Sequence, residues 1–149
     1  MFRIELVIRI SPYPAQSVSV DTCCRFNHRS CYLCAALANK VNAEKIILFS
    51  PFISLPEAAK ASDLGFLHPF VRHKLPVKQY LSQLKNSCII LAHGEKDNIV
   101  PFFHSQKIIE SLDSSNQVFF LQSSTAKHND ILMKIYPQLD TKLGQCPDG

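Results

Sequence analysis

The stretch that decides the fold is Cys88-Ile-Ile-Leu-Ala-His93-Gly94-Glu-Lys-Asp97-Asn-Ile-Val-Pro101. Its first half is an unbroken apolar run, which is typical of a strand buried on both faces of a parallel sheet. Gly94 ends the run, and residues 102–112 place their apolar side chains on one side of a predicted helix. The stretch therefore predicts a buried strand, a polar loop that contains Asp97, and a helix.

The same order of elements occurs on both sides of this stretch. Residues 45–49 and 117–122 are two further short apolar runs, and both predict buried strands. Further helices are predicted at residues 32–40, in parts of 55–81, and at 128–136, where Pro137 should end the last helix. Strands separated by helices predict right-handed crossovers. The expected fold class is α/β, a partial three-layer α/β/α sandwich with a mostly parallel sheet.

Two polar residues follow successive predicted strands. Asp97 comes after the predicted strand at 87–93, and His128 comes after the strand at 117–122. Taken singly, Asp97 suits a turn and His128 suits the start of a helix. Because ligands and catalytic groups of open α/β sheets gather beyond the C-terminal strand ends, the pair is predicted to lie at the functional edge.

Three segments carry a resemblance to the α/β-hydrolase family. The segment at 93–101 resembles the family's acid loop, H-G-x-x-D-x-x-V-P, and the segment at 124–130 is similar to its histidine loop. Ile47-Leu-Phe-Ser-Pro-Phe52 resembles a strand end in serine hydrolases that act on acyl esters and thioesters. The resemblance covers residues 43–134, about the C-terminal half of such a domain.

The resemblance implies a truncated α/β-hydrolase fold and a role for each of the two polar residues. Asp97 would be the acid that orients the catalytic histidine, and His128 would be the base. In its complete form such a protein is a serine hydrolase of ester, thioester or related acyl bonds, with a small-molecule or acyl substrate and no cofactor.

The nucleophile of the family has no clear counterpart. It lies on a sharp G-x-S-x-G turn, and this chain has no glycine before Gly65. Counting back from the match at 47–52, this turn should fall on Phe26-Asn-His28-Arg-Ser30, where His28 takes the nucleophile's place. Ser30 is the only serine close enough to substitute, so it is the candidate nucleophile. We expect the chain to be truncated or inactive.

Residues 1–30 differ in character from the rest and are interpreted as an atypical leader. Residues 31–137 would be the hydrolase-like part, and 138–149 a flexible tail. One explanation is a fragment or frame-disrupted product in which the leader is joined to a genuine C-terminal half. The other is a divergent pseudo-hydrolase or interaction module, which would bind a protein partner or self-associate through an exposed sheet edge.

Composition narrows the partners and the compartment. Sixteen basic and twelve acidic residues give a net charge of +4, and the basic residues are scattered, so no nucleic-acid partner is predicted. The longest apolar stretch is too short to span a membrane, and the N-terminus makes a poor secretory signal, so a cytoplasmic location is expected.

The six cysteines show no regular disulfide framework. A zinc ion could be held by a cluster in the first part of the chain, Cys23, Cys24, His28, Cys31 and Cys34. The favoured interpretation is that Cys31 and Cys34 are small apolar residues on a helix, and no metal site is predicted.

Overall fold

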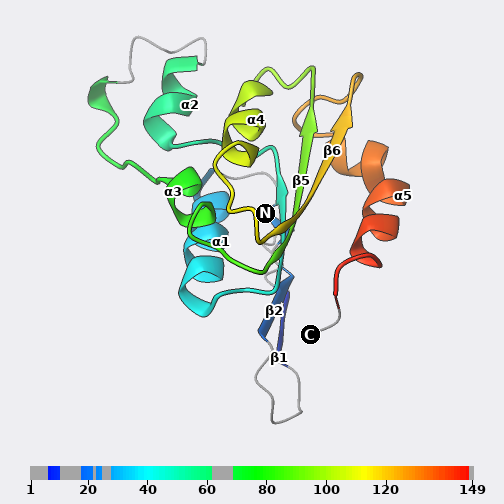
Figure 1. Cartoon of the computed structure of the whole chain (residues 1–149). Coiled ribbons are helices and arrows are strands. Elements are labelled where there is room, and N and C mark those ends of the chain that lie inside the picture. The colour runs from blue at the N-terminus through cyan, green and yellow to red at the C-terminus, as the bar shows by residue number, and fades with distance from the viewer. Residues whose placement is uncertain (1–6, 11–17, 22, 25–27, 62–68, 148–149) are drawn as a thin grey trace.

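The computed structural model describes residues 7–10, 18–21, 23–24, 28–61 and 69–147, with side chains from residue 31 onward. Four strands form one parallel sheet (Figure 1). Their order in the sheet is β3 (Cys23–Cys24), β4 (Lys45–Phe49), β5 (Cys88–Gly94) and β6 (Gln117–Ser123). Every strand therefore lies beside the next strand in the sequence. This sheet confirms the predicted α/β class.

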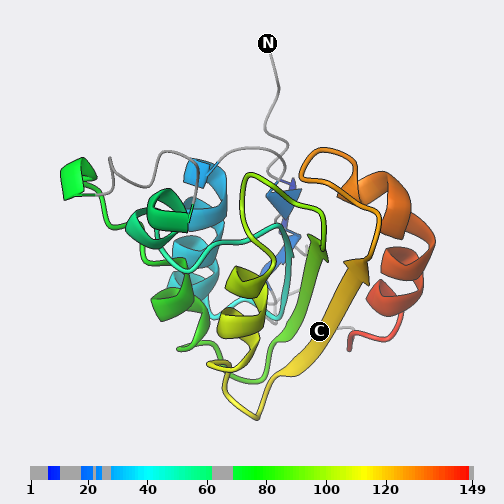
Figure 2. The ribbon, with the colours of Figure 1, turned by 90° about the horizontal axis from the view of Figure 1, so that it is seen from above.

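Helices cover both faces of the sheet, which gives the predicted three layers (Figure 2). The first face, called here the four-helix face, is covered by α1 (His28–Val41), α2 (Leu55–Ala61), α3 (Val77–Leu81) and α4 (Phe103–Ile109). The second face, called the α5 face, is covered by α5 (Ile131–Leu143). Within the described residues, the two layers thus differ in the number of helices that they contain.

The strands supply both cores because their side chains alternate between the faces. In β5, Ile89 and Leu91 belong to the core of the four-helix face, whereas Ile90 and Ala92 belong to the core of the α5 face. All seven residues of β5 are buried. A strand covered on both sides needs apolar residues at every position, which is why residues 88–92 form a continuous apolar run.

The predicted end of the last helix at Pro137 is wrong, because α5 continues to Leu143. Its buried residues, Ile131, Ile135 and Leu139, recur every four positions on both sides of the proline. Proline removes one backbone donor, and its partner would be the carbonyl of Met133, whose side chain is exposed to solvent. Burial of the apolar stripe outweighs that loss. The expected tail at 138–149 therefore begins inside α5.

A disulfide between Cys88 and Cys146 was also not predicted. It joins the first residue of β5 to the segment after α5, and both cysteines are buried on the α5 face. The two residues are 58 positions apart, and sequence alone gives no measure of their distance in the fold.

A small antiparallel sheet precedes the parallel one. Strands β1 (Val7–Ile10) and β2 (Val18–Asp21) pair with each other. No helix in the described part of the chain is long and apolar enough to cross a membrane.

Candidate active site

Asp97 lies in a tight turn directly after β5. One carboxylate oxygen, Oδ1, accepts hydrogen bonds from the backbone N–H groups of Ile99 at 2.9 Å and Val100 at 2.8 Å. The backbone N–H of Asp97 donates to the carbonyl of Gly94 at 3.1 Å. The side chain is 0% exposed. These bonds fix the orientation of the carboxylate, because an aspartate that bonds its own turn has little freedom to rotate.

The second carboxylate oxygen of Asp97 is directed at His128. Oδ2 lies 2.7 Å from Nδ1 of the imidazole, whose side chain is 15% exposed. An ionised carboxylate only accepts hydrogen bonds, so Nδ1 carries the proton. In the neutral ring, Nε2 is then the basic nitrogen. The structure thus brings together the two residues that the sequence placed at one sheet edge.

Backbone contacts join the loop that carries Asp97 to the loop that carries His128. The N–H of Glu95 donates to the carbonyl of Ser123 at 3.0 Å, and the N–H of Lys96 donates to the carbonyl of Ala126 at 3.1 Å. Gly94 packs so closely against Ala126 that a Cβ at position 94 would overlap the Ala126 carbonyl oxygen. In the sequence, this contact is signalled by nothing more than the small size of the residues at 94 and 126, and it was not predicted.

The environment of Asp97 keeps its carboxyl ionised. Burial alone raises the pKa of this group, but hydrogen bonds to the charged form outweigh burial and hold the pKa well below its ordinary value. The groups that lower the pKa are, from largest to smallest effect, the side chains of His128 and His93, the backbone N–H of Val100, and the side chain of Ser50. Asp97 is therefore a stable negative partner for a histidine that gains a proton.

His93, a residue of β5, supports the turn that carries Asp97. Its Nε2 lies 2.8 Å from the carbonyl oxygen of Val100, which can only accept, so Nε2 carries the proton. Its Nδ1 then accepts a hydrogen bond from the hydroxyl of Ser105 at 2.6 Å. The ring is 0% exposed. Both ring nitrogens of His93 therefore make hydrogen bonds inside the protein.

Two more buried polar groups surround the turn. His104 accepts a hydrogen bond at Nδ1 from the N–H of Ile53 at 3.4 Å, and its Nε2 has no partner within the described residues. Burial, with a smaller contribution from His93, lowers the pKa of His104 to about 4, so its ring is neutral at pH 7. Ser50 follows β4 with a positive φ of 44°. Its hydroxyl makes no well-formed hydrogen bond to a described residue, although its proximity still lowers the pKa of Asp97.

The Asp97–His128 pair connects the two helical layers. The loop of Asp97 leads into α4 on the four-helix face, and the loop of His128 leads into α5 on the other face. Figure 2 shows both loops at the same end of the sheet. The geometry of the pair therefore depends on how both layers are held against the sheet.

Ser30, the candidate nucleophile, is the third residue of α1. Its side chain and residues 25–27 lie outside the described residues. The predicted turn at 26–30 includes the junction between β3 and α1. A strand-to-helix junction of this kind is where a nucleophile turn occurs.

The cysteines of α1 belong to the core. Cys31 and Cys34 are each 4% exposed and pack in the four-helix core, in agreement with the apolar interpretation. The other zinc candidates, Cys23, Cys24 and His28, have side chains outside the described residues. Among the side chains that are described, no group of three or more metal-binding residues occurs.

No protein-family model and no curated protein sequence matches the chain. Solved structures do match it. An acylaminoacyl peptidase from Pyrococcus horikoshii has a TM-score of 0.59 and 15% identity, over 75% of this chain and 22% of its own. An esterase from Pyrococcus furiosus has a TM-score of 0.55 and 17% identity, over 80% of this chain and 48% of its own.

A third match, acetyl xylan esterase 1 from a Thermoanaerobacterium species, has a TM-score of 0.56 and 14% identity. It is matched over 80% of this chain and 43% of its own. The chain thus spans less than half the length of these three proteins.

Proposed function

Because the chain has the α/β-hydrolase fold over the part that these structures match, we propose that Asp97 and His128 are the acid and base of a serine-hydrolase site. The proposed substrates of the complete site are esters, thioesters or related acyl compounds. Solved neighbours that are named esterases and peptidases support this class. The observation that carries the proposal is the 2.7 Å contact between Asp97 Oδ2 and His128 Nδ1.

The chemistry follows from the tautomer of His128. Its Nε2 would accept the proton of a hydroxyl nucleophile and later donate it to the leaving group. The imidazolium that forms between these steps is stabilised by Asp97, whose carboxylate stays ionised and fixed by its turn. These are two of the three groups that acyl transfer by a serine hydrolase requires.

We further propose that this chain does not turn over an acyl substrate by itself. A nucleophile must lie on a turn tight enough to expose its side chain beside the base, and that turn normally needs glycine. The segment at 26–30 contains none. Ser30 is the one hydroxyl that the proposal leaves as a candidate nucleophile.

The proposed compartment is the cytosol. Disulfides such as Cys88–Cys146 are more common in oxidising compartments, so the redox state of this bond bears directly on that proposal.

The pairing of acid and base can be tested without turnover. A proton on Nδ1 of His128 that is held by an ionised carboxylate should give a strongly downfield resonance in a proton NMR spectrum. Asp97→Asn should remove it. Asp113→Asn is the matched control, because Asp113 also accepts a backbone N–H in a turn but precedes β6, whereas His128 follows it at the other end of the strand. A resonance that persists in Asp97→Asn would contradict the pairing.

A fluorophosphonate probe tests for the nucleophile. Since the chain lacks the required turn, we expect no covalent labelling of the purified protein. Ser30→Ala serves as the control for any label that appears. Labelling that disappears in Ser30→Ala would overturn the proposal of inactivity and would identify Ser30 as the nucleophile.

A second candidate function is that of a non-catalytic interaction module. In the described part of the chain, β3 pairs with β4 and with no other strand. A strand edge of this kind offers backbone groups to a partner strand. If a separately expressed N-terminal half of a hydrolase or a second copy pairs there, light scattering after gel filtration should show a complex larger than 16.8 kDa. A strictly monomeric protein that binds no such half would count against this candidate.

A further inference from the structure

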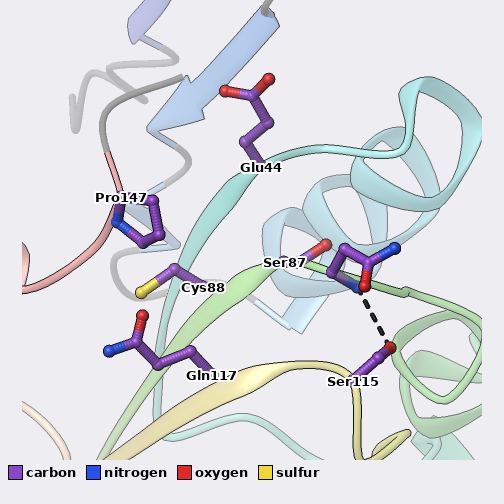
Figure 3. Close-up of a pocket in the computed structure, with 7 residues that line it drawn as sticks. Glu44, Ser87, Cys88, Ser115, Gln117 and Pro147 are labelled. Atoms are coloured by element: carbon purple, nitrogen blue, oxygen red, sulfur yellow. Dashed lines mark hydrogen bonds between the residues drawn. The ribbon is translucent and has the colours of Figure 1, made fainter.

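A cavity of about 370 Å³ lies at the N-terminal ends of the strands, whereas Asp97 and His128 lie beyond the C-terminal ends. Residues before or at the start of β4, β5 and β6 form its walls (Figure 3). These residues are Glu44, Asn86, Ser87, Cys88, Ser115 and Gln117. A volume of several hundred Å³ accommodates a small organic molecule.

The walls contributed by the strand ends are held in place by hydrogen bonds between them. The backbone N–H of Asn86 donates to the hydroxyl of Ser115 at 3.2 Å, and the N–H of Ser87 donates to the side-chain oxygen of Asn116 at 2.9 Å. The amide of Asn116 donates in turn to the carbonyl of Leu84 at 2.8 Å. These bonds between backbone and side-chain groups hold the two walls in place.

The remaining wall is Pro147, which the disulfide brings to the sheet. Cys146 is bonded to Cys88, and the next residue lines the cavity. The amide of Gln117 also donates to the carbonyl of Gln145 at 3.3 Å. In Figure 3, Pro147 and Cys88 lie between Glu44 and Gln117. This part of the cavity offers an apolar surface between two polar side chains.

The charged group that remains for a ligand is an acceptor, whereas the side-chain amides of Asn86 and Gln117 can both donate and accept. The carboxylate of Glu44 has no hydrogen-bond or ion-pair partner among the described residues, and the side-chain oxygen of Gln117 is likewise unused there. The hydroxyl of Ser87 is already committed, because it donates to the carbonyl of Ala43 at 2.7 Å. Neither Lys45 nor Lys85, which flank the lining residues in sequence, lines the cavity. A lining whose one charged group is negative favours a ligand that is positive and carries N–H donors for that carboxylate.

We propose that this cavity binds a small organic cation, with an ammonium or guanidinium group at Glu44 and Gln117 and a short apolar body against Pro147 and the disulfide. The site is separate from Asp97 and His128 and does not depend on the proposed hydrolase chemistry. Glu44 supplies the charge selectivity, because it is the one charged residue among the described residues that line the cavity.

The matched probes are n-butylguanidinium chloride and its neutral isostere n-butylurea, added to the oxidised full chain at constant ionic strength. Backbone amide resonances of residues 86–88 and 115–117 should shift and saturate with the guanidinium compound. The urea should produce no saturable shift. Glu44→Gln should weaken guanidinium binding about fivefold, as expected for a partly exposed ion pair. Glu57→Gln, which removes the same charge from the exposed side of α2, should leave binding unchanged.

Three results would overturn the proposal. They are equal binding of the two probes, equal affinity in Glu44→Gln and the native chain, and shifts that lie outside the lining residues. An unchanged melting temperature of Glu44→Gln would establish that a loss of binding reflects the lost carboxylate rather than unfolding.

Discussion

The two faces of the sheet are stabilised in different ways. The four-helix face buries a large apolar core and also contains the polar groups around Asp97, including His93 and His104. Among the described residues, the α5 face has one helix, a smaller core and a disulfide from β5 to the segment after that helix. The first layer is thus held by packing and is sensitive to pH, whereas the second is held partly by a covalent bond and is sensitive to reduction.

Removing the disulfide should have the largest effect on stability. A cross-link between residues 58 positions apart stabilises the folded state by about 4 kcal/mol in the chain-entropy model. Cys146→Ser should lower the free energy of unfolding by up to that amount in urea titrations. Hydrogen exchange should increase first in α5, while α1 stays protected, because the lost bond serves one face.

Reduction of the native chain provides the control for that prediction. The reduced protein should match Cys146→Ser in both stability and exchange. Equal loss of protection in α1 and α5 would show that the two faces are not independently stabilised, and the comparison between them would fail.

Gly94→Ala should have an intermediate effect on stability, because it disturbs the contact between the loop that carries Asp97 and the loop that carries His128. The added methyl group would collide with the backbone of Ala126, and the forced shift should cost about 2 kcal/mol. The loop of His128 should move away from Asp97, so the downfield NMR resonance should weaken or vanish. A control variant, Gly144→Ala, adds the same methyl group where the nearest atoms are at 3.7 Å, and it should leave that resonance intact.

His104→Gln, a substitution on the four-helix face, should have the smallest effect on the free energy of unfolding at neutral pH. The pKa of His104 falls from 6.5 to about 4 on folding, so the unfolded chain binds the proton first as pH decreases. The stability that this neutral ring contributes is complete above pH 6.5 and is lost between there and about pH 4. His104→Gln should flatten the stability profile in that interval.

Asp97 affects stability in a lower pH interval than His104, and its side chain is an acid rather than a base. The pKa of its carboxyl is depressed on folding, so the stability that it contributes is present above its unfolded value of about 4 and is lost as pH falls further. Urea titrations from pH 8 to pH 3 separate the two intervals. If His104→Gln and the native chain showed the same dependence of stability on pH, His104 would not be the source of the loss between pH 6.5 and about pH 4.

The sequence was most informative where burial leaves a strong pattern. Strands covered on both faces must be apolar throughout, so the predicted strands at 45–49 and 87–93 agree with β4 and β5 to within a residue at each end. The placement of Asp97 and His128 at one edge followed from the parallel arrangement of these strands, and the structure brings the two together.

Features that depend on distant partners were not predictable. The burial of His104 and the contact between Gly94 and Ala126 arise only when separate loops meet. The prediction ended the last helix at Pro137 because proline normally stops a helix. It did not weigh the apolar stripe that continues from Ile135 to Leu139 on the other side of the proline. The pairing of Cys88 with Cys146 required their separation in space.

The sequential order of the strands has a consequence for biosynthesis. Because β3, β4, β5 and β6 lie side by side in the order in which they are translated, each strand finds its neighbour already present as it leaves the ribosome. The bond between Cys88 and Cys146 must wait until α5 has emerged. During translation the four-helix layer can therefore assemble first, and the exposed side of the nascent sheet is the surface that a chaperone would have to shield.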